Sequence, residues 1–236
     1  VTIADNNTLI ATAARLSGKT IGGEGTVNAT NLEAGPAGLG ADLSAITAST
    51  VTATIDSTGN PQLTSSADLG DFVVTISGTG KVTAEVTAQE SATLPSGTGS
   101  FVVGQEAELE VTAAKADGLT VSGTGKTTVT ALDSTAAAAD LSNITTSGLT
   151  TVNTSADMTF TGSFPGSAFT LDGDNTVTMN NNAISSTVTI ANGNTLIATA
   201  ARLSGKTIGG EGTVNATNLE AGLGADLSAI TAPTVT

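Results

Sequence analysis

The sequence lacks several residue types on which common kinds of protein chemistry depend. It has no cysteine, histidine, tryptophan or tyrosine, and phenylalanine occurs only 5 times in 236 residues. Without cysteine or histidine there is no disulfide, thiol nucleophile, Ser-His-Asp triad or histidine metal site. Without tryptophan or tyrosine, the aromatic platforms typical of sugar-processing sites are missing too. We therefore predict that the chain is not an enzyme. Its 21 acidic residues leave a polysaccharide-acting β-helix enzyme as a second alternative.

Positive charge is also scarce. Seven basic residues oppose 21 acidic ones, which gives a net charge of −14. A nucleic-acid interface needs a basic stripe that neutralises phosphates, so nucleic acid is excluded as a partner. No apolar run approaches the length of roughly 18 residues that a membrane helix needs, so we expect no membrane insertion. Strong acidity instead favours solubility or an association with divalent cations.

The apolar residues that are present are small. Hydrophobic types make up 39% of the chain, and most of them are alanine, valine, leucine and isoleucine. Threonine and glycine are abundant. Such side chains fill only a thin core, and β-branched residues pack well on pleated surfaces. This composition indicates stacked β-structure rather than a globule with a bulky aromatic core.

A long duplication organises the chain. Residues 188–236 repeat residues 1–52 after omission of three residues, and they differ only where Asn192, Gly193 and Pro233 replace Asp5, Asn6 and Ser49. We interpret residues 1–187 as one full long repeat of a continuous solenoid and residues 188–236 as the start of the next. The near-identity suggests a tandem array, so we expect the chain to belong to a longer series of such repeats.

A shorter pattern recurs inside the long repeat. An alternating strand is followed by a turn with two glycines or Gly-x-Asn, and then by a second alternating strand, which is the signature of half-buried strands joined by tight turns. In the second strands, valine, alanine and methionine alternate with polar residues. The residues expected to point inward are Val27, Ala29, Val82, Ala84, Val86, Val129, Ala131, Val177, Met179, Val214 and Ala216. Those expected to face water are Asn28, Thr83, Glu85, Thr130, Thr178 and Asn215.

A third pattern, Asp-Leu-Ser-x-Ile-Thr, occurs at residues 42–47, 140–145 and 226–231. Leucine and isoleucine three residues apart do not alternate, so the pattern predicts a corner before a threonine-rich strand. The aspartate at each corner is expected to be structural, because such carboxylates commonly accept nearby backbone N–H groups. Residues 8–15 and 134–140 have some helical propensity, but they are short, so we predict one helical turn at most.

Together these patterns predict an all-β fold, a parallel β-solenoid with variable loops. Coils of roughly 20 residues are usual for β-type repeats, which gives roughly 10–12 coils. Right-handed crossings should join the parallel strands.

The Ala/Thr/Gly-rich alternation, the Ser-Gly-Thr-Gly turns and the Asp-Leu-Ser-x-Ile-Thr corners resemble bacterial surface-layer proteins and large repetitive secreted adhesins. The resemblance implies a secreted β-solenoid at the cell surface, often with calcium-dependent assembly. One departure concerns calcium. The Gly-Gly-x-Gly-x-Asp repeats of such proteins are absent, since Gly22-Gly23-Glu24-Gly25 is followed by Thr26-Val27.

Two acidic clusters are candidate Ca²⁺ ligands, because hard cations prefer clustered oxygens. Glu106, Glu108 and Glu110 alternate, which places three carboxylates on one strand face. Asp172 and Asp174 share one turn. A solvated face that discourages strand pairing is the alternative for the glutamates, and a plain Asp-Gly turn is the alternative for the aspartates.

The function that these observations favour is structural. We predict a non-enzymatic, extracellular or cell-surface protein, a repeat segment of a bacterial surface layer, fibre or adhesin stalk. It would associate with itself end to end and laterally, with cell-surface glycans as possible contacts. The alternative is an ice- or carbohydrate-binding adhesin module, because Thr-x-Thr pairs resemble the threonine faces of ice-binding solenoids. The unequal spacing of those pairs argues against a regular face.

Overall fold

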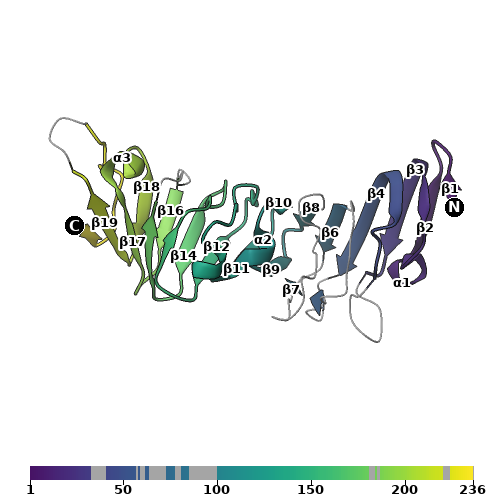
Figure 1. Cartoon of the computed structure of the whole chain (residues 1–236), viewed down its shortest axis with the longest axis horizontal. Helices are drawn as coiled ribbons and strands as arrows, with labels where there is room; N and C mark the ends of the chain where they lie inside the picture. The colour runs from purple at the N-terminus through teal and green to yellow at the C-terminus, as the bar shows by residue number, and fades with distance from the viewer. Residues whose placement is uncertain are drawn as a thin grey trace. The chain divides into compact units, whose positions relative to one another are not determined.

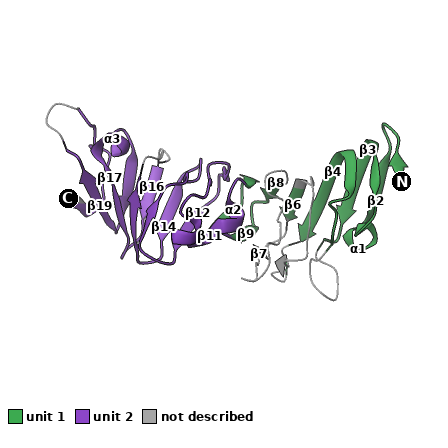
Figure 2. Cartoon of the chain, in the orientation of Figure 1, with its two compact units in different colours: residues 1–111, 119–127 green, residues 112–118, 128–236 purple. Residues whose placement is uncertain are grey.

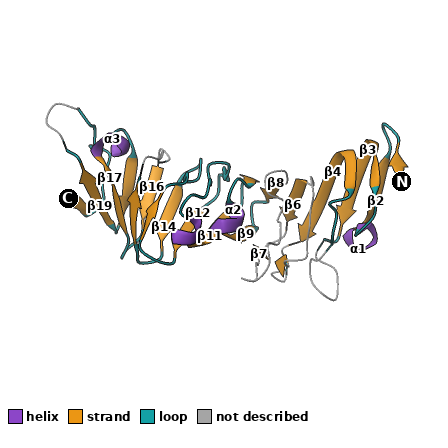
Figure 3. Ribbon diagram, viewed as in Figure 1, coloured by secondary structure: helices purple, strands orange, loops and turns teal. Residues whose placement is uncertain are grey.

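The computed structural model describes residues 1–32, 41–56, 58, 62–63, 73–77, 81–84, 100–180, 184, 187–219 and 224–235. The protein is all-β, and its parallel strands stack as a β-solenoid of about 9 turns with very little helix (Figure 1). This confirms the predicted fold class. In the described residues the α-helical segments are single turns of 4 residues (Figure 3), because the flanking glycines and β-branched residues do not sustain longer helices.

The chain forms two compact units, coloured separately in Figure 2. Unit 1 contains residues 1–111 and 119–127, and unit 2 contains residues 112–118 and 128–236.

Unit 1 is built from parallel strands in the order β1-β3-β4-β6-β8-β10, with β2 also paired to β3, and from a second series β5-β7-β9. Its elements are β1 (Thr2–Ile3), β2 (Thr8–Thr12), α1 (Ala13–Leu16), β3 (Ile21–Thr30), β4 (Ile46–Asp56), β5 (Gln62–Leu63), β6 (Val73–Ser77), β7 (Lys81–Ala84), β8 (Ser100–Val103), β9 (Glu108–Thr112) and β10 (Thr120–Gly123).

Unit 2 has one series of strands in the order β18-β16-β14-β12-β11 and another in the order β13-β15-β17-β19-β20. Its elements are α2 (Ala113–Ala116), β11 (Lys126–Leu132, which begins in unit 1), the 3₁₀ turn η1 (Ser134–Ala136), β12 (Thr150–Thr154), β13 (Met158–Phe160), β14 (Phe169–Asp172), β15 (Thr176–Met179), β16 (Thr187–Ile190), β17 (Thr195–Thr199), α3 (Ala200–Leu203), β18 (Thr207–Gly210), β19 (Thr213–Thr217) and β20 (Thr234–Val235).

The core is the thin aliphatic layer that the composition predicts. Most of the predicted inward residues are buried, namely Val27, Ala29, Val129, Val177, Met179, Val214 and Ala216. The predicted outward residues Asn28, Thr130, Thr178 and Asn215 are half-exposed. The side chains of Val82, Thr83 and Ala84 and all of Glu85 and Val86 lie outside the described part of the chain.

Ala131 is a correction, because it is exposed and Leu132 is fully buried in its place. Its φ of 53° lies in the left-handed region, which breaks the two-residue alternation of an extended strand. Asn31 and Asn218 adopt the same conformation, with φ of 51° and 55°. Asparagine tolerates this conformation better than alanine does. The asparagines at the equivalent positions of the other copies therefore indicate the left-handed conformation.

The expected number of coils was too high, because the coils differ in length. A coil close to the assumed length separates Thr150 from its register partner Phe169. A clearly longer coil separates Val73 from its register partner Ser100. The connections absorb the difference, so strand register does not depend on coil length.

The structure also reveals a third copy of the module that opens the chain. The β2-α1-β3 segment, the β9-α2-β10-β11 segment and the β17-α3-β18-β19 segment share the same order of elements. Gly23, Gly123 and Gly210 have φ of 113°, 109° and 104°. A Cβ at each would lie 2.1–2.2 Å from the carbonyl oxygen of Ile3, Val103 or Ile190. The backbone of the neighbouring coil therefore requires glycine there.

Candidate functional site

The most regular side-chain arrangement is a clamp between two successive coils, which we call the corner clamp. After each helical turn, the N–H of Gly18, Gly118 or Gly205 donates to the carbonyl oxygen of an aspartate one coil later, always at 2.8 Å. The residue before the glycine completes the clamp by accepting that aspartate's own N–H. Its acceptor atom is Ser17 Oγ (3.0 Å), Asp117 Oδ1 (2.8 Å) or Ser204 Oγ (2.9 Å).

The clamped residues are Asp42, Asp140 and Asp226. Each carboxylate also accepts the N–H of the serine two residues later, at 3.0–3.1 Å. This confirms their predicted structural role. The Ser142 hydroxyl and backbone N–H hold the pKa of Asp140 below its usual value, and Ser228 lowers the pKa of Asp226 in the same way. Hydrogen bonds to the charged form cause both shifts.

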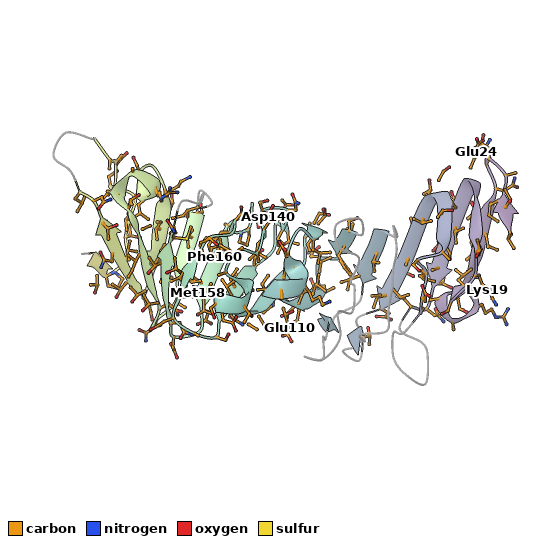
Figure 4. The ribbon with its side chains drawn as sticks, viewed as in Figure 1. Lys19, Glu24, Glu110, Asp140, Met158 and Phe160 are labelled. Carbon is orange, nitrogen blue, oxygen red and sulfur yellow. The ribbon has the colours of Figure 1, made fainter. Side chains whose placement is uncertain are left out.

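Glu108 and Glu110 lie on the outward face of β9, flanking the buried Leu109, and Glu106 lies exposed in the turn before that strand. Figure 4 labels Glu110. The register partners of Glu108 and Glu110 on β7 are Lys81 and Thr83. Within the residues that the structure describes, no three carboxylates gather into a group that could hold a metal ion.

Asp172 and Asp174 shape one turn. The Asp172 carboxylate accepts the N–H of Gly173 at 2.8 Å, and its carbonyl accepts the hydroxyl of Thr154 at 2.9 Å. Asp174 has a φ of 59°, and its carboxylate lies against Gly193 of the next coil. Both residues therefore serve turn geometry, and Ca²⁺ binding by either remains a prediction.

The outward surface of the series β13-β15-β17-β19-β20 is rich in threonine, and we call it the threonine face. Thr176, Thr195, Thr213 and Thr234 are successive register partners and form one column across four strands. Two positions along, Thr159 pairs with Thr178. Four positions along, Thr199 pairs with Thr217.

Unequal sequence spacing concealed these columns. The steps in residue number from Thr176 to Thr195, then to Thr213 and then to Thr234 all differ, so no constant sequence period marks this column. The parallel ladder nevertheless brings the hydroxyls into line, about 4.8 Å apart from strand to strand. Unit 1 has the same feature, since Thr8, Thr26 and Thr50 are also successive register partners.

No family model, curated protein or solved structure matches this chain. None of the helices in the described residues has both the length and the apolar character required to cross a membrane.

Proposed function

We propose that this chain is a non-enzymatic, extracellular structural protein, a repeat segment of a surface layer, fibre or adhesin stalk that assembles end to end. The observation that carries the proposal is the corner clamp, which occurs three times with nearly the same distances. Each clamp joins a coil to the next one through one backbone–backbone hydrogen bond and one backbone–side-chain hydrogen bond. The fold is therefore a series of similar coils, each stabilised by the coil next to it, as in other solenoids.

Two apolar side chains support end-to-end assembly. Leu32 is 2% exposed, whereas its sequence counterpart Leu219 is 65% exposed. Ile10, on the strand β2, is 64% exposed. In unit 1 a further coil covers Leu32, whose N–H donates to the carbonyl oxygen of Thr54. A further coil, from the same polypeptide or from another molecule, would cover Leu219 in the same way.

Sedimentation velocity of the full chain across a range of concentrations, with electron microscopy of the particles, tests this assembly. We expect concentration-dependent linear oligomers. Leu219→Asp and Ile10→Asp should shift the population to monomer, because a charge in an apolar contact is costly. Leu149→Asp is the matched control, since Leu149 is 56% exposed but lies in neither of those coils. A chain that stays monomeric at every concentration would contradict the proposal.

The same experiment tests Ca²⁺. Arms with calcium, magnesium or chelator at matched ionic strength show whether carboxylates such as Glu106, Glu108 and Glu110 bridge molecules laterally. Self-repulsion at a net charge of −14 should oppose lateral packing unless it is screened or bridged. We expect calcium to strengthen lateral association. Equal assembly in all three arms would remove any specific ion from the proposal.

A second candidate function is ice binding, favoured by the threonine face. Its aligned hydroxyl and methyl groups repeat at the strand spacing of about 4.8 Å, and charged residues are absent from the outward positions of β15, β17 and β19. Thermal hysteresis of the full chain tests this function. Its loss in Thr195→Glu, but not in Thr170→Glu on the other series of strands, would assign the activity to this face.

A further inference from the structure

An open hollow of about 450 Å³ lies at one edge of the threonine face, within unit 2. It is lined by Ser134 of η1, by Asp157, Met158 and Thr159 of the β13 region, and by Thr176 and Thr178 of β15. β13 is the first strand of its series, and η1 packs against it. The hollow therefore lies where the outward surface of β13 and β15 meets the turn η1.

The wall that η1 forms is held in place by Asp133. One carboxylate oxygen of Asp133 accepts the N–H of Thr135 at 2.8 Å and its hydroxyl at 2.6 Å. The other oxygen accepts the Ser155 hydroxyl at 3.3 Å. These bonds tie η1 to the loop that leads into β13, so Ser134 keeps a fixed position relative to the strands.

The polar groups around the hollow are largely unused. Asp157 Oδ1 accepts the backbone N–H of Thr176 at 2.6 Å. Within the described chain, its second oxygen has no partner, and neither have the hydroxyls of Ser134, Thr159, Thr176 and Thr178. Hydroxyls both donate and accept, whereas an ionised carboxylate only accepts. Four such hydroxyls and one carboxylate oxygen thus surround a single space.

The core beneath the hollow is apolar and well packed. Met158 is 7% exposed, and Phe160, on the same strand, is fully buried. Figure 4 labels both side chains. Phe160 lies 4.6 Å from Phe164, and Phe164 lies 4.7 Å from Phe169, measured between ring centroids. This stack is the main aromatic packing among the described residues, and it supports the strand that carries Met158 and Thr159.

We propose that this hollow is a binding site for a neutral carbohydrate. A sugar ring has a rim of hydroxyls, which fits the surrounding hydroxyls. The second oxygen of Asp157 would accept a hydrogen bond from a sugar hydroxyl. Anionic ligands are disfavoured by that carboxylate and by the net charge of −14. Pairs along the threonine face, Thr195 with Thr213 and Thr199 with Thr217, offer further hydroxyls to a longer glycan chain.

Two isosteric variants test the site in the full chain. Asp157→Asn keeps an oxygen for the Thr176 N–H but removes the charge, so we expect about tenfold weaker sugar binding, the usual scale for a charged hydrogen bond. Thr178→Val removes one hydroxyl and should weaken binding about threefold. Thr170→Val is the control. Thr170 is an outward threonine of β14, whose register partners are Thr151 and Thr189, and it does not line the hollow.

The probes are cellohexaose, chitohexaose and maltohexaose, with binding followed by chemical-shift perturbation of backbone amides and by saturation-transfer difference NMR. We expect one of the three sugars to shift the amides of Thr159, Thr176 and Thr178, with wild-type affinity in Thr170→Val. No perturbation by any of them would overturn the site, and so would binding that both variants leave unchanged. The site does not rest on the scaffold role, which is scored separately by sedimentation of the same variants.

Discussion

Residues 1–32 and 188–219 have nearly the same sequence, yet different positions are buried in the two copies. In the first copy Leu32 is 2% exposed, and in the second copy its counterpart Leu219 is 65% exposed. An asparagine shows the opposite difference, because Asn7 of the first copy is exposed and its counterpart Asn194 in the second copy is 1% exposed. Asn194 accepts the N–H of Asn175, one coil earlier, at 3.3 Å. The sequence of a coil therefore does not determine its own burial, because each side chain needs the adjacent coil.

One sequence difference between the two copies also depends on the adjacent coil. Gly193 replaces Asn6, and both have positive φ, 81° and 61°. In the second copy a Cβ at position 193 would lie 2.1 Å from Asp174 Oδ1 of the preceding coil. In the first copy the Asn6 side chain is free to donate to Asp5 Oδ2 at 3.0 Å. Glycine appears where a neighbouring coil occupies the space.

The largest expected effect concerns a position enclosed on every side. Val129 is fully buried, so Val129→Asp places a charge in the aliphatic layer. We expect it to lower the unfolding free energy of its unit by more than about 4 kcal/mol. The control is Ala131→Asp on the same strand, which is exposed and has a φ that aspartate tolerates. Urea denaturation of both variants checks the prediction, and equal stabilities would show that the inward register is wrong.

The second prediction compares the effects on stability of truncating Leu32 and its counterpart Leu219. Leu32→Ala should cost about 2–5 kcal/mol, as large-to-small core substitutions do. Leu219→Ala should stay within about 0.5 kcal/mol, as exposed substitutions usually do. Hydrogen exchange at concentrations where the chain is monomeric is the suitable measurement, because coils can open locally. Similar costs at the two positions would contradict the dependence of burial on the adjacent coil.

The smallest expected effect concerns pH. The folded-state pKa of Asp140 is lowered from a reference of 3.8 by its bonds from Ser142. Its contribution is therefore fully present above the unfolded pKa and is lost as the pH falls through the folded pKa. Because the carboxylate is largely exposed, we expect less than about 1 kcal/mol. Thermal melts of Asp140→Ala and wild type should differ at neutral pH and converge below about pH 3. A gap that persists in strong acid would assign the effect to something other than the carboxylate.

Much of the fold could be predicted from the sequence because inward residues follow a simple alternation. Val27, Val129 and Val177 are inward as expected, and Asp42, Asp140 and Asp226 bond their local backbone as expected. The error at Ala131 has a local cause, since one left-handed residue shifts the alternation and alanine gives no sign of that conformation.

The candidate sites were less accessible from sequence. The third copy of the module was missed because its outward residues differ, with Glu108 and Glu110 where the other copies have threonine and isoleucine. The hollow was missed because Ser134, Asp157 and Thr178 are far apart in the chain and unremarkable singly. Only strand register brings them together, and connections of unequal length hide from the sequence which positions become register partners.

The connection between the paired residues Ile21 and Ile46 shows where the gene can gain or lose codons. Ile21 pairs with Ile46, and the equivalent Ile208 pairs with Ile230 across the shorter connection of the second copy. The same pairing thus survives the removal of three residues between its partners. Loop-closure entropy changes only slowly with length, so codons can be gained or lost here with little effect on the ladder. This connection is therefore the natural place for an inserted peptide or tag, and for divergence between otherwise identical copies.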